Sequence, residues 1–127
     1  MNLKLNHLDL QVADVQRSVD LFERLLGLQL QSSRTSPVLA ILSDGAGFTL
    51  VLQRRKDDTP YPDGFHFGFL VDDPETVRAF QASARRWESL RVSDVIENGR
   101  GVLTYVRTWD DLLLEVSWQR PRREDLP

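Results

Sequence analysis

The two histidines of this chain occupy matching places in an internal repeat. His7 leads to Asp14 through HLDLQVAD, and His66 leads to Asp73 through HFGFLVDD with the same spacing. In each copy an apolar segment with the alternation of a strand separates the two residues, and the aspartate then begins an amphipathic helical stretch. Imidazole nitrogens are common ligands of divalent ions. A repeat that places its only two histidines symmetrically is therefore a candidate for a shared metal site.

A carboxylate completes the candidate site. In the last expected strand, 112–118, large apolar side chains alternate onto one face and leave Glu115 on the other. His7 likewise lies opposite the apolar set of its strand. Two imidazoles and one carboxylate make a facial triad that leaves up to three positions for water or substrate, and it suits Fe(II), Mn(II), Zn(II), Ni(II) or Co(II) better than Ca(II). The alternative is that His7, His66 and Glu115 are surface residues of a solvated sheet.

The elements that must position these residues follow a β-α-β-β-β order in each half. The expected strands are 5–12, 28–34, 38–42 and 48–54, then 65–71, 91–97, 102–107 and 112–118. The helices begin at Asp14 and Asp73, and their apolar stripes are Val15, Val19, Phe22, Leu26 and Val77, Phe80, Ala84, Trp87. We expect an α+β fold of two tandem modules, about 3–56 and 64–119 of a single domain 1–127. Their mixed sheets would curl into a cup with the helices on its outer face.

Composition narrows the class of protein. The chain is 41% hydrophobic and 28% charged, with a net charge of −3 and no cysteine. These values argue against a nucleic-acid partner, and they exclude disulfides and thiolate ligands. The N-terminus is too polar for a signal peptide and no apolar run has membrane-spanning length, so we expect a cytoplasmic protein with no membrane partner. The polar end, 120–127, is expected to fray.

The duplication and three sequence segments resemble the vicinal oxygen chelate superfamily. These segments are NHLDLQVADVQRSVDLFERLLGLQL, FHFGFLVDD and YVRTWDDLLLEVSW. That superfamily includes glyoxalase I, extradiol dioxygenases, fosfomycin-resistance enzymes and bleomycin-binding proteins. The resemblance implies that His7, His66 and Glu115 bind one divalent ion, which chelates two neighbouring substrate oxygens as a Lewis acid. It also implies a homodimer, in which a site belongs to one chain or is shared between two.

The resemblance does not select one chemistry. Glyoxalase I-like members add a fourth ligand, but alignment of the turns makes Val51 the counterpart of Glu115, and Gln53 would serve only with a shifted register. Fosfomycin-resistance enzymes need a threonine near the first histidine, where this chain carries Asp9, whose charge would repel an anionic substrate. We therefore reject the fosfomycin activity, and the glyoxalase interpretation weakens.

Tyr105 slightly favours a ring-cleaving dioxygenase. The stretch from Tyr105 to Glu115 is similar to the extradiol pattern in its length and in its Tyr, Arg, second Asp and Glu, which implies a catalytic phenol. Two features argue against a dioxygenase: both histidines are already assigned to the metal, and the chain is short for this class of enzyme. We expect a metal-dependent enzyme acting on a small molecule with vicinal oxygens. The alternatives are a glyoxalase-type lyase or isomerase, a metal-free protein that binds an aromatic drug, and a scaffold domain whose triad is vestigial.

Overall fold

The fold is described from a computed structural model, in which residues 1–122 are placed. Residues 123–127, most of the terminus that was expected to fray, lie outside the described residues. The chain divides into two compact units, Met1–Thr59 and Pro60–Pro127. Within residues 1–122 each unit contains one helix and one mixed sheet, so the predicted α+β class is confirmed.

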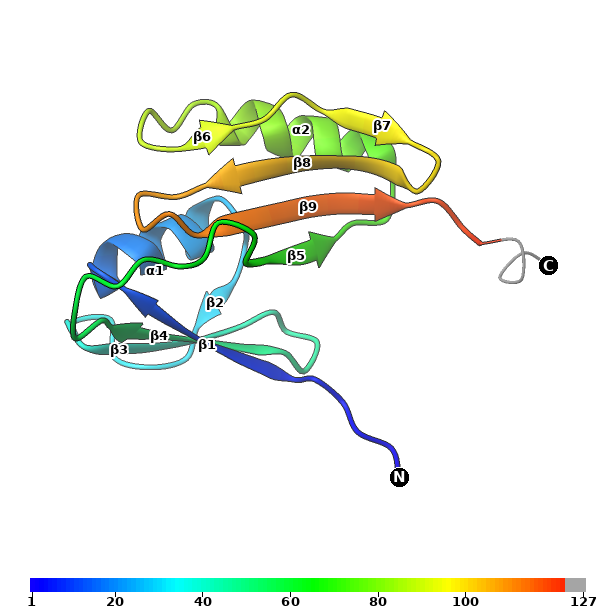
Figure 1. The fold of residues 1–127 in the computed structure, drawn as a ribbon. Coiled ribbons are helices and arrows are strands. Elements are labelled where there is room, and N and C mark those ends of the chain that lie inside the picture. Colours follow the sequence, from blue (N-terminus) through cyan, green and yellow to red (C-terminus); the bar gives the residue numbers. More distant parts are fainter. Residues whose placement is uncertain (123–127) are drawn as a thin grey trace. The chain divides into compact units, whose positions relative to one another are not determined.

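Unit 1 is a four-stranded sheet with one helix. Its elements are β1 (His7–Val12), α1 (Val15–Arg24), β2 (Gln29–Leu30), β3 (Leu39–Ser43) and β4 (Thr49–Arg54). The strand order is β1-β4-β3-β2, in which β1 runs parallel to β4 and the other neighbours are antiparallel (Figure 1). The expected strand 28–34 is reduced to two residues, because the Ser32 hydroxyl accepts the Ile41 N–H at 2.9 Å in place of a backbone partner.

Helix α1 begins where the sequence predicts and ends at Arg24. The Asp14 carboxylate accepts the Arg17 N–H at 3.0 Å, which satisfies one of the free donors of the first turn. After the helix, Gly27 adopts a φ of 73°, a left-handed conformation that glycine tolerates without a Cβ clash. The apolar face packs on the sheet, and its buried side chains meet alternate residues of the strands. This core comprises Leu10, Val12, Val15, Val19, Leu21, Phe22, Ala40, Leu42, Leu50 and Leu52.

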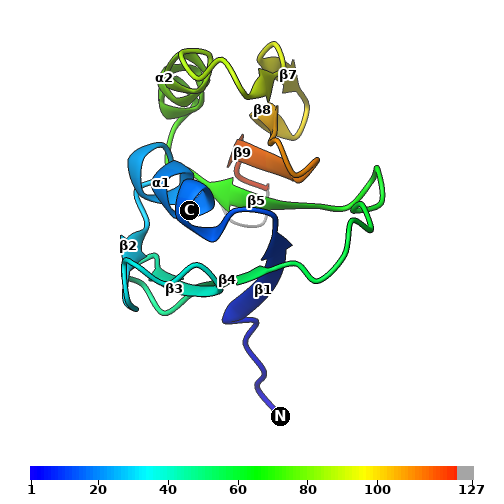
Figure 2. The same ribbon diagram turned by 90° about the vertical axis from the view of Figure 1, so that its left-hand side faces the viewer.

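Unit 2 repeats this plan with an additional strand. Its elements are β5 (His66–Leu70), α2 (Pro74–Ala84), β6 (Arg91–Val92), β7 (Ile96–Asn98), β8 (Gly101–Arg107) and β9 (Leu113–Gln119). The strand order is β5-β9-β8-β6, β7 also pairs with β8, and β5 runs parallel to β9. Helix α2 covers one face of β8 and β9 (Figure 2). The core beneath the helix includes Val77, Ala84, Leu90, Val102, Thr104, Val106, Leu112, Leu114 and Val116.

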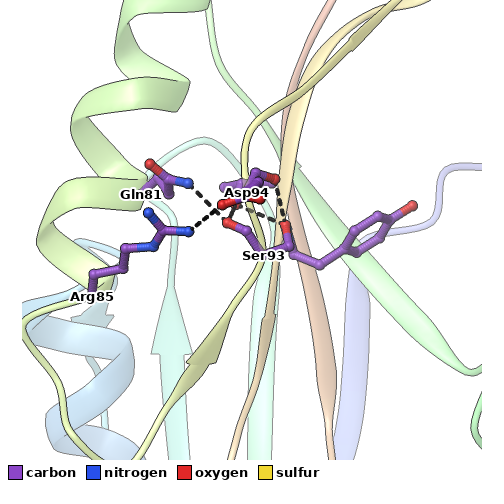
Figure 3. A network of polar contacts seen from close by, with 6 residues as sticks. Gln81, Arg85, Ser93 and Asp94 are labelled. Carbon is purple, nitrogen blue, oxygen red and sulfur yellow. Dashed lines mark hydrogen bonds and ion pairs between the residues drawn. The ribbon is translucent and has the colours of Figure 1, made fainter.

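The prediction of one continuous strand over 91–97 is wrong. The chain stops pairing with β8 after Val92 and pairs with it again as β7. In between, the Ser93 side chain takes the place of a backbone partner in the ladder (Figure 3). Its backbone N–H donates to the Tyr105 carbonyl at 2.9 Å, and its hydroxyl accepts the Tyr105 N–H at 2.9 Å. The Gln81 amide of α2 donates to the Ser93 carbonyl at 2.8 Å, and Arg85 forms an ion pair with Asp94 at 2.8 Å. This network ties α2 to the backbone of Tyr105.

Within residues 1–122 no helix combines the length and the apolar character needed to cross a membrane.

Candidate functional site

One face of the unit 2 sheet gathers three of the four predicted site residues. Strand register places Glu115 of β9 between Gly68 of β5 and Tyr105 of β8. His66 precedes Gly68 by two residues and therefore points to the same face of β5. The rings of His66 and Tyr105 meet edge to face, with centroids 6.0 Å apart and planes at 84°. The face opposite the helix thus carries an imidazole, a carboxylate and a phenol together.

Glu115 leans toward β5 because its neighbour there is a glycine. A Cβ built on Gly68 would lie 3.4 Å from Glu115 Oε2, 3.4 Å from its Cβ and 3.2 Å from its carbonyl oxygen. The carboxylate therefore occupies space that any larger residue at position 68 would share. Gly68 brings the Glu115 carboxylate over the strand that carries His66.

Tyr105 is coupled to the same carboxylate. Burial raises the pKa of the Tyr105 phenol above its ordinary value of 10.0, and a hydrogen bond to Glu115 and the carboxylate's negative charge raise it further. The phenol consequently stays protonated at neutral pH. It can hold a proton at its oxygen beside any ligand that reaches Glu115.

Both histidines have the hydrogen bond that a metal-binding imidazole needs. The Nδ1 atom of His66 lies 3.1 Å from the Gly64 carbonyl oxygen, which only accepts, so Nδ1 carries the proton. In the neutral ring Nε2 then keeps its lone pair. The Nδ1 atom of His7 lies 2.9 Å from Asn6 Oδ1, which assigns the same tautomer to that ring. Both imidazoles therefore offer Nε2 as a ligand, an arrangement typical of metal-binding histidines.

In unit 1 the corresponding carboxylate is missing. Asp9 lies opposite Val51 in the sheet, two residues after His7, just as Gly68 lies opposite Glu115 two residues after His66. The register thus makes Val51 the counterpart of Glu115, as the sequence alignment predicts. Gln53 lies two residues after Val51 and on the same face of β4. Its amide donates to Asp9 Oδ2 at 2.6 Å, so the two side chains hold each other on this face.

The structure brings His66, Tyr105 and Glu115 together, and His7 lies exposed at the start of β1 in unit 1. In the described part of the chain, 1–122, no three His, Asp or Glu side chains form a ready cation cluster. Sequence reasoning missed Gly68, Gly64 and Asn6, the residues that orient the expected ligands. A glycine two residues after a strand histidine was the available signal for the first of them.

A groove of about 610 Å³ begins at Tyr105 and Glu115. It follows β8 and β9 to the turn that joins β7 and β8 and to the residues after β9, and all its lining residues belong to unit 2. Arg100, Arg120 and Arg122 line its far end. A small molecule that reaches Glu115 therefore has room to extend along the sheet.

Comparison with known proteins identifies the class of protein that has this fold. Residues 4–109 match the model of the glyoxalase/bleomycin resistance protein/dioxygenase superfamily. The chain belongs to this superfamily. The match covers most of the chain and includes both histidines and Tyr105.

Solved structures with the same fold come from several branches of the superfamily. A possible glyoxalase from Bacillus cereus is 27% identical, with a TM-score of 0.79 over 91% of this chain and 99% of that one. The fosfomycin resistance protein FosX from Listeria monocytogenes is 16% identical, with a TM-score of 0.79 over 98% of both chains. A bleomycin-binding protein from Streptomyces verticillus, complexed with copper(II)-bleomycin, is 18% identical, with a TM-score of 0.69 over 94% and 100%. A comparison with curated protein sequences finds no significant match.

Proposed function

We propose that the protein is a metal-dependent enzyme that acts on a small molecule with two adjacent oxygens. His7, His66 and Glu115 would hold one divalent ion, and Tyr105 would act beside it. The observation that carries this proposal is the juxtaposition of His66, Glu115 and Tyr105 on one face of the unit 2 sheet. The donor set fits Fe(II), Mn(II), Zn(II), Ni(II) or Co(II).

The ligand chemistry of the described residues fits such an ion. Carbonyl and amide oxygens fix both histidines in the tautomer that presents Nε2. Glu115 supplies an anionic oxygen. When bound, the ion supplies Lewis acidity to the two substrate oxygens and stabilises negative charge that develops on them.

Tyr105 supplies a proton at a defined place. Burial and the nearby Glu115 raise the pKa of its phenol and keep it neutral, and the Ser93 hydroxyl accepts its backbone N–H. Register pairs Tyr105 with Glu115, so a substrate oxygen at Glu115 would lie beside this phenol. General acid catalysis by a positioned side chain contributes about 10²–10⁴-fold to a rate.

Ring cleavage by a dioxygenase is slightly favoured over a glyoxalase-type lyase or isomerase. The position that would supply a fourth ligand holds Val51, which cannot bind a metal. An open coordination position is what a substrate and dioxygen together require. A second candidate is a binding protein for an aromatic drug, because a bleomycin-binding protein shares the fold. We also propose a homodimer, which sedimentation analysis would test.

Measurement of oxygen uptake tests the proposed chemistry. Protein loaded with Fe(II) or Mn(II) is supplied with a panel of catechols, and we expect uptake coupled to ring cleavage. Tyr105→Phe should slow turnover about 10²-fold or more without loss of metal. Tyr61→Phe, a change to the only other tyrosine, is the matched control and should keep full activity.

Other outcomes would change the assignment. Turnover of α-hydroxy ketones or hemithioacetals without oxygen uptake would replace the dioxygenase by the lyase or isomerase. Tight binding of aromatic compounds by metal-free protein, with no turnover of either substrate class, would contradict the proposal that the protein is an enzyme.

A further inference from the structure

The segment that leads into β5 ends in a tight turn. The Phe65 N–H donates to the Pro62 carbonyl at 3.0 Å, so the chain makes a β-turn here with Asp63 and Gly64 at its centre. The rings of Tyr61 and Phe65 stack, with centroids 5.3 Å apart and planes at 15°. The carbonyls of the two central residues take no part in the turn's own hydrogen bond and can accept from side chains of unit 2.

Two side chains bind these two carbonyls. The His66 imidazole donates from Nδ1 to the Gly64 oxygen at 3.1 Å. The Arg107 guanidinium donates from Nη2 to the Asp63 oxygen at 3.4 Å, a long hydrogen bond that the positive charge strengthens. Consecutive carbonyls of one turn are thus bound by an expected metal ligand and by an arginine of β8. A movement of the turn that breaks the bond to Arg107 would also displace the acceptor of His66.

The sheet places Arg107 within reach of this turn. Register puts Leu113 of β9 between His66 of β5 and Arg107 of β8, so the three residues form one row across the sheet. Their side chains lie on the face that carries Tyr105, which precedes Arg107 by two residues on β8. The Arg107 side chain therefore spans the width of β9 to reach the turn.

The guanidinium of Arg107 is itself fixed at a second turn. Its Nη1 atom donates to the Asp111 carbonyl at 3.0 Å, between β8 and β9. Backbone hydrogen bonds close that turn, from the Thr108 N–H to the Leu112 carbonyl at 2.9 Å and from the Asp111 N–H to the Thr108 carbonyl at 3.0 Å. A planar guanidinium bound through two of its nitrogens is held in one orientation. Arg107 therefore joins the turn before β5 to the turn before β9.

We propose that Arg107 is a positioning residue for His66. It holds the turn at 62–65 so that the Gly64 carbonyl keeps the imidazole with its proton on Nδ1 and its lone pair on Nε2. The use of Nε2 as a metal ligand rests on the proposed function, whereas the orientation of the ring does not. Because residues that orient a metal ligand contribute about 10–100-fold to metal affinity and Arg107 acts through the turn, we expect it to contribute about tenfold.

NMR of the metal-free protein tests this role. The chain has two histidines, so its spectra contain two imidazole rings, which His7→Gln assigns. At about pH 9 imidazole is neutral, and its bare and protonated nitrogens give widely separated signals. We expect wild-type His66 to carry its proton on Nδ1. In Arg107→Gln the ring should exchange between both tautomers, so the signals of its two nitrogens should move toward each other.

Matched variants locate the effect. Arg91 lies opposite Arg107 in the sheet and, within residues 1–122, binds the Asp111 carboxylate at 3.1 Å and not the turn at 62–65. Arg91→Gln should therefore leave the His66 signals unchanged. Arg107→Lys keeps the charge and can reach one of the two carbonyls, so its His66 signals should lie between those of the wild type and Arg107→Gln. This variant also tests the proposal if Arg107→Gln fails to fold.

Three results would overturn the proposal. The first is a wild-type His66 ring with its proton on Nε2, and the second is unchanged His66 signals in both Arg107 variants. The third is an equal shift of the His7 signals, because Asn6 orients that ring in unit 1 and Arg107 should not affect it.

Competition with a chelator separates this role from the proposed function. Arg107→Gln should bind a divalent ion about tenfold more weakly than the wild type. A wild type that binds no divalent ion, while its His66 tautomer still depends on Arg107, would contradict the proposed function and leave the positioning role intact. Metal affinity that is lost in His66→Ala but unchanged in Arg107→Gln, with an unchanged tautomer, would overturn the positioning role and leave the proposed function intact.

Discussion

Glu115 lies so close to Gly68 that a side chain at position 68 would press against it. A Cβ there would be 3.2 Å from the Glu115 carbonyl oxygen and 3.4 Å from Oε2. In Gly68→Ala the glutamate must shift by a few tenths of an ångström. Because residues that orient a ligand contribute about 10–100-fold to metal affinity, we expect a loss of about tenfold.

Competition with a chelator measures this loss. Gly99→Ala is the control, because its Cβ would meet nothing within 4 Å. Folding stability should change by no more than about 1 kcal/mol, since alanine is less costly than glycine in regular structure. Unchanged metal affinity in Gly68→Ala would show that the position of Glu115 is not critical.

The Tyr105 phenol should titrate above pH 10.0. Burial is the largest cause of the raised pKa, and the hydrogen bond and charge of Glu115 add to it. Since the folded pKa exceeds the unfolded one, the neutral phenol stabilises the fold below pH 10, and this contribution is lost as the pH rises through the folded pKa. In a Tyr61→Phe background the absorbance of the phenolate reports Tyr105 alone.

Glu115→Gln should lower the pKa of Tyr105 but leave it above 10.0, because burial remains. An equal pKa in both proteins would remove Glu115 from the surroundings of the phenol. A wild-type value at or below 10.0 would contradict the geometry of this face.

Ser93→Ala should destabilise unit 2. The change leaves the Tyr105 N–H without its acceptor in a half-buried strand, which costs about 1–3 kcal/mol. Urea unfolding measures the loss, and Ser83→Ala, an exposed change on α2, should leave stability nearly unchanged. A Ser93→Ala protein as stable as the wild type would show that the ladder closes without the hydroxyl.

The repeat and its periodicity made most of the fold predictable. Apolar alternation located the strands that carry His7 and His66, and Asp14 and Asp73 cap their helices as expected. The break after Val92 was not predictable, because it depends on a serine hydroxyl that replaces a backbone acceptor. The pattern of a single sequence shows side-chain periodicity, but it does not show where a side chain takes the place of a backbone hydrogen-bond partner.

The candidate site was predictable in part. Alternation put Glu115 on the face opposite the helix, and the repeat placed His66 on the same face. The contact with Gly68 and the tautomers of the two histidines depend on strand pairing and on carbonyl positions. Those arise only when the chain folds, so no spacing in the sequence contains them.

The metal content of purified protein tests the central claim most directly. Protein prepared without chelator should contain one divalent ion per chain, and His7→Ala, His66→Ala and Glu115→Ala should each lose it while remaining folded. Glu97→Ala, which removes an exposed carboxylate from β7, should keep the ion. Variants that all retain the metal content of the wild type would contradict the account.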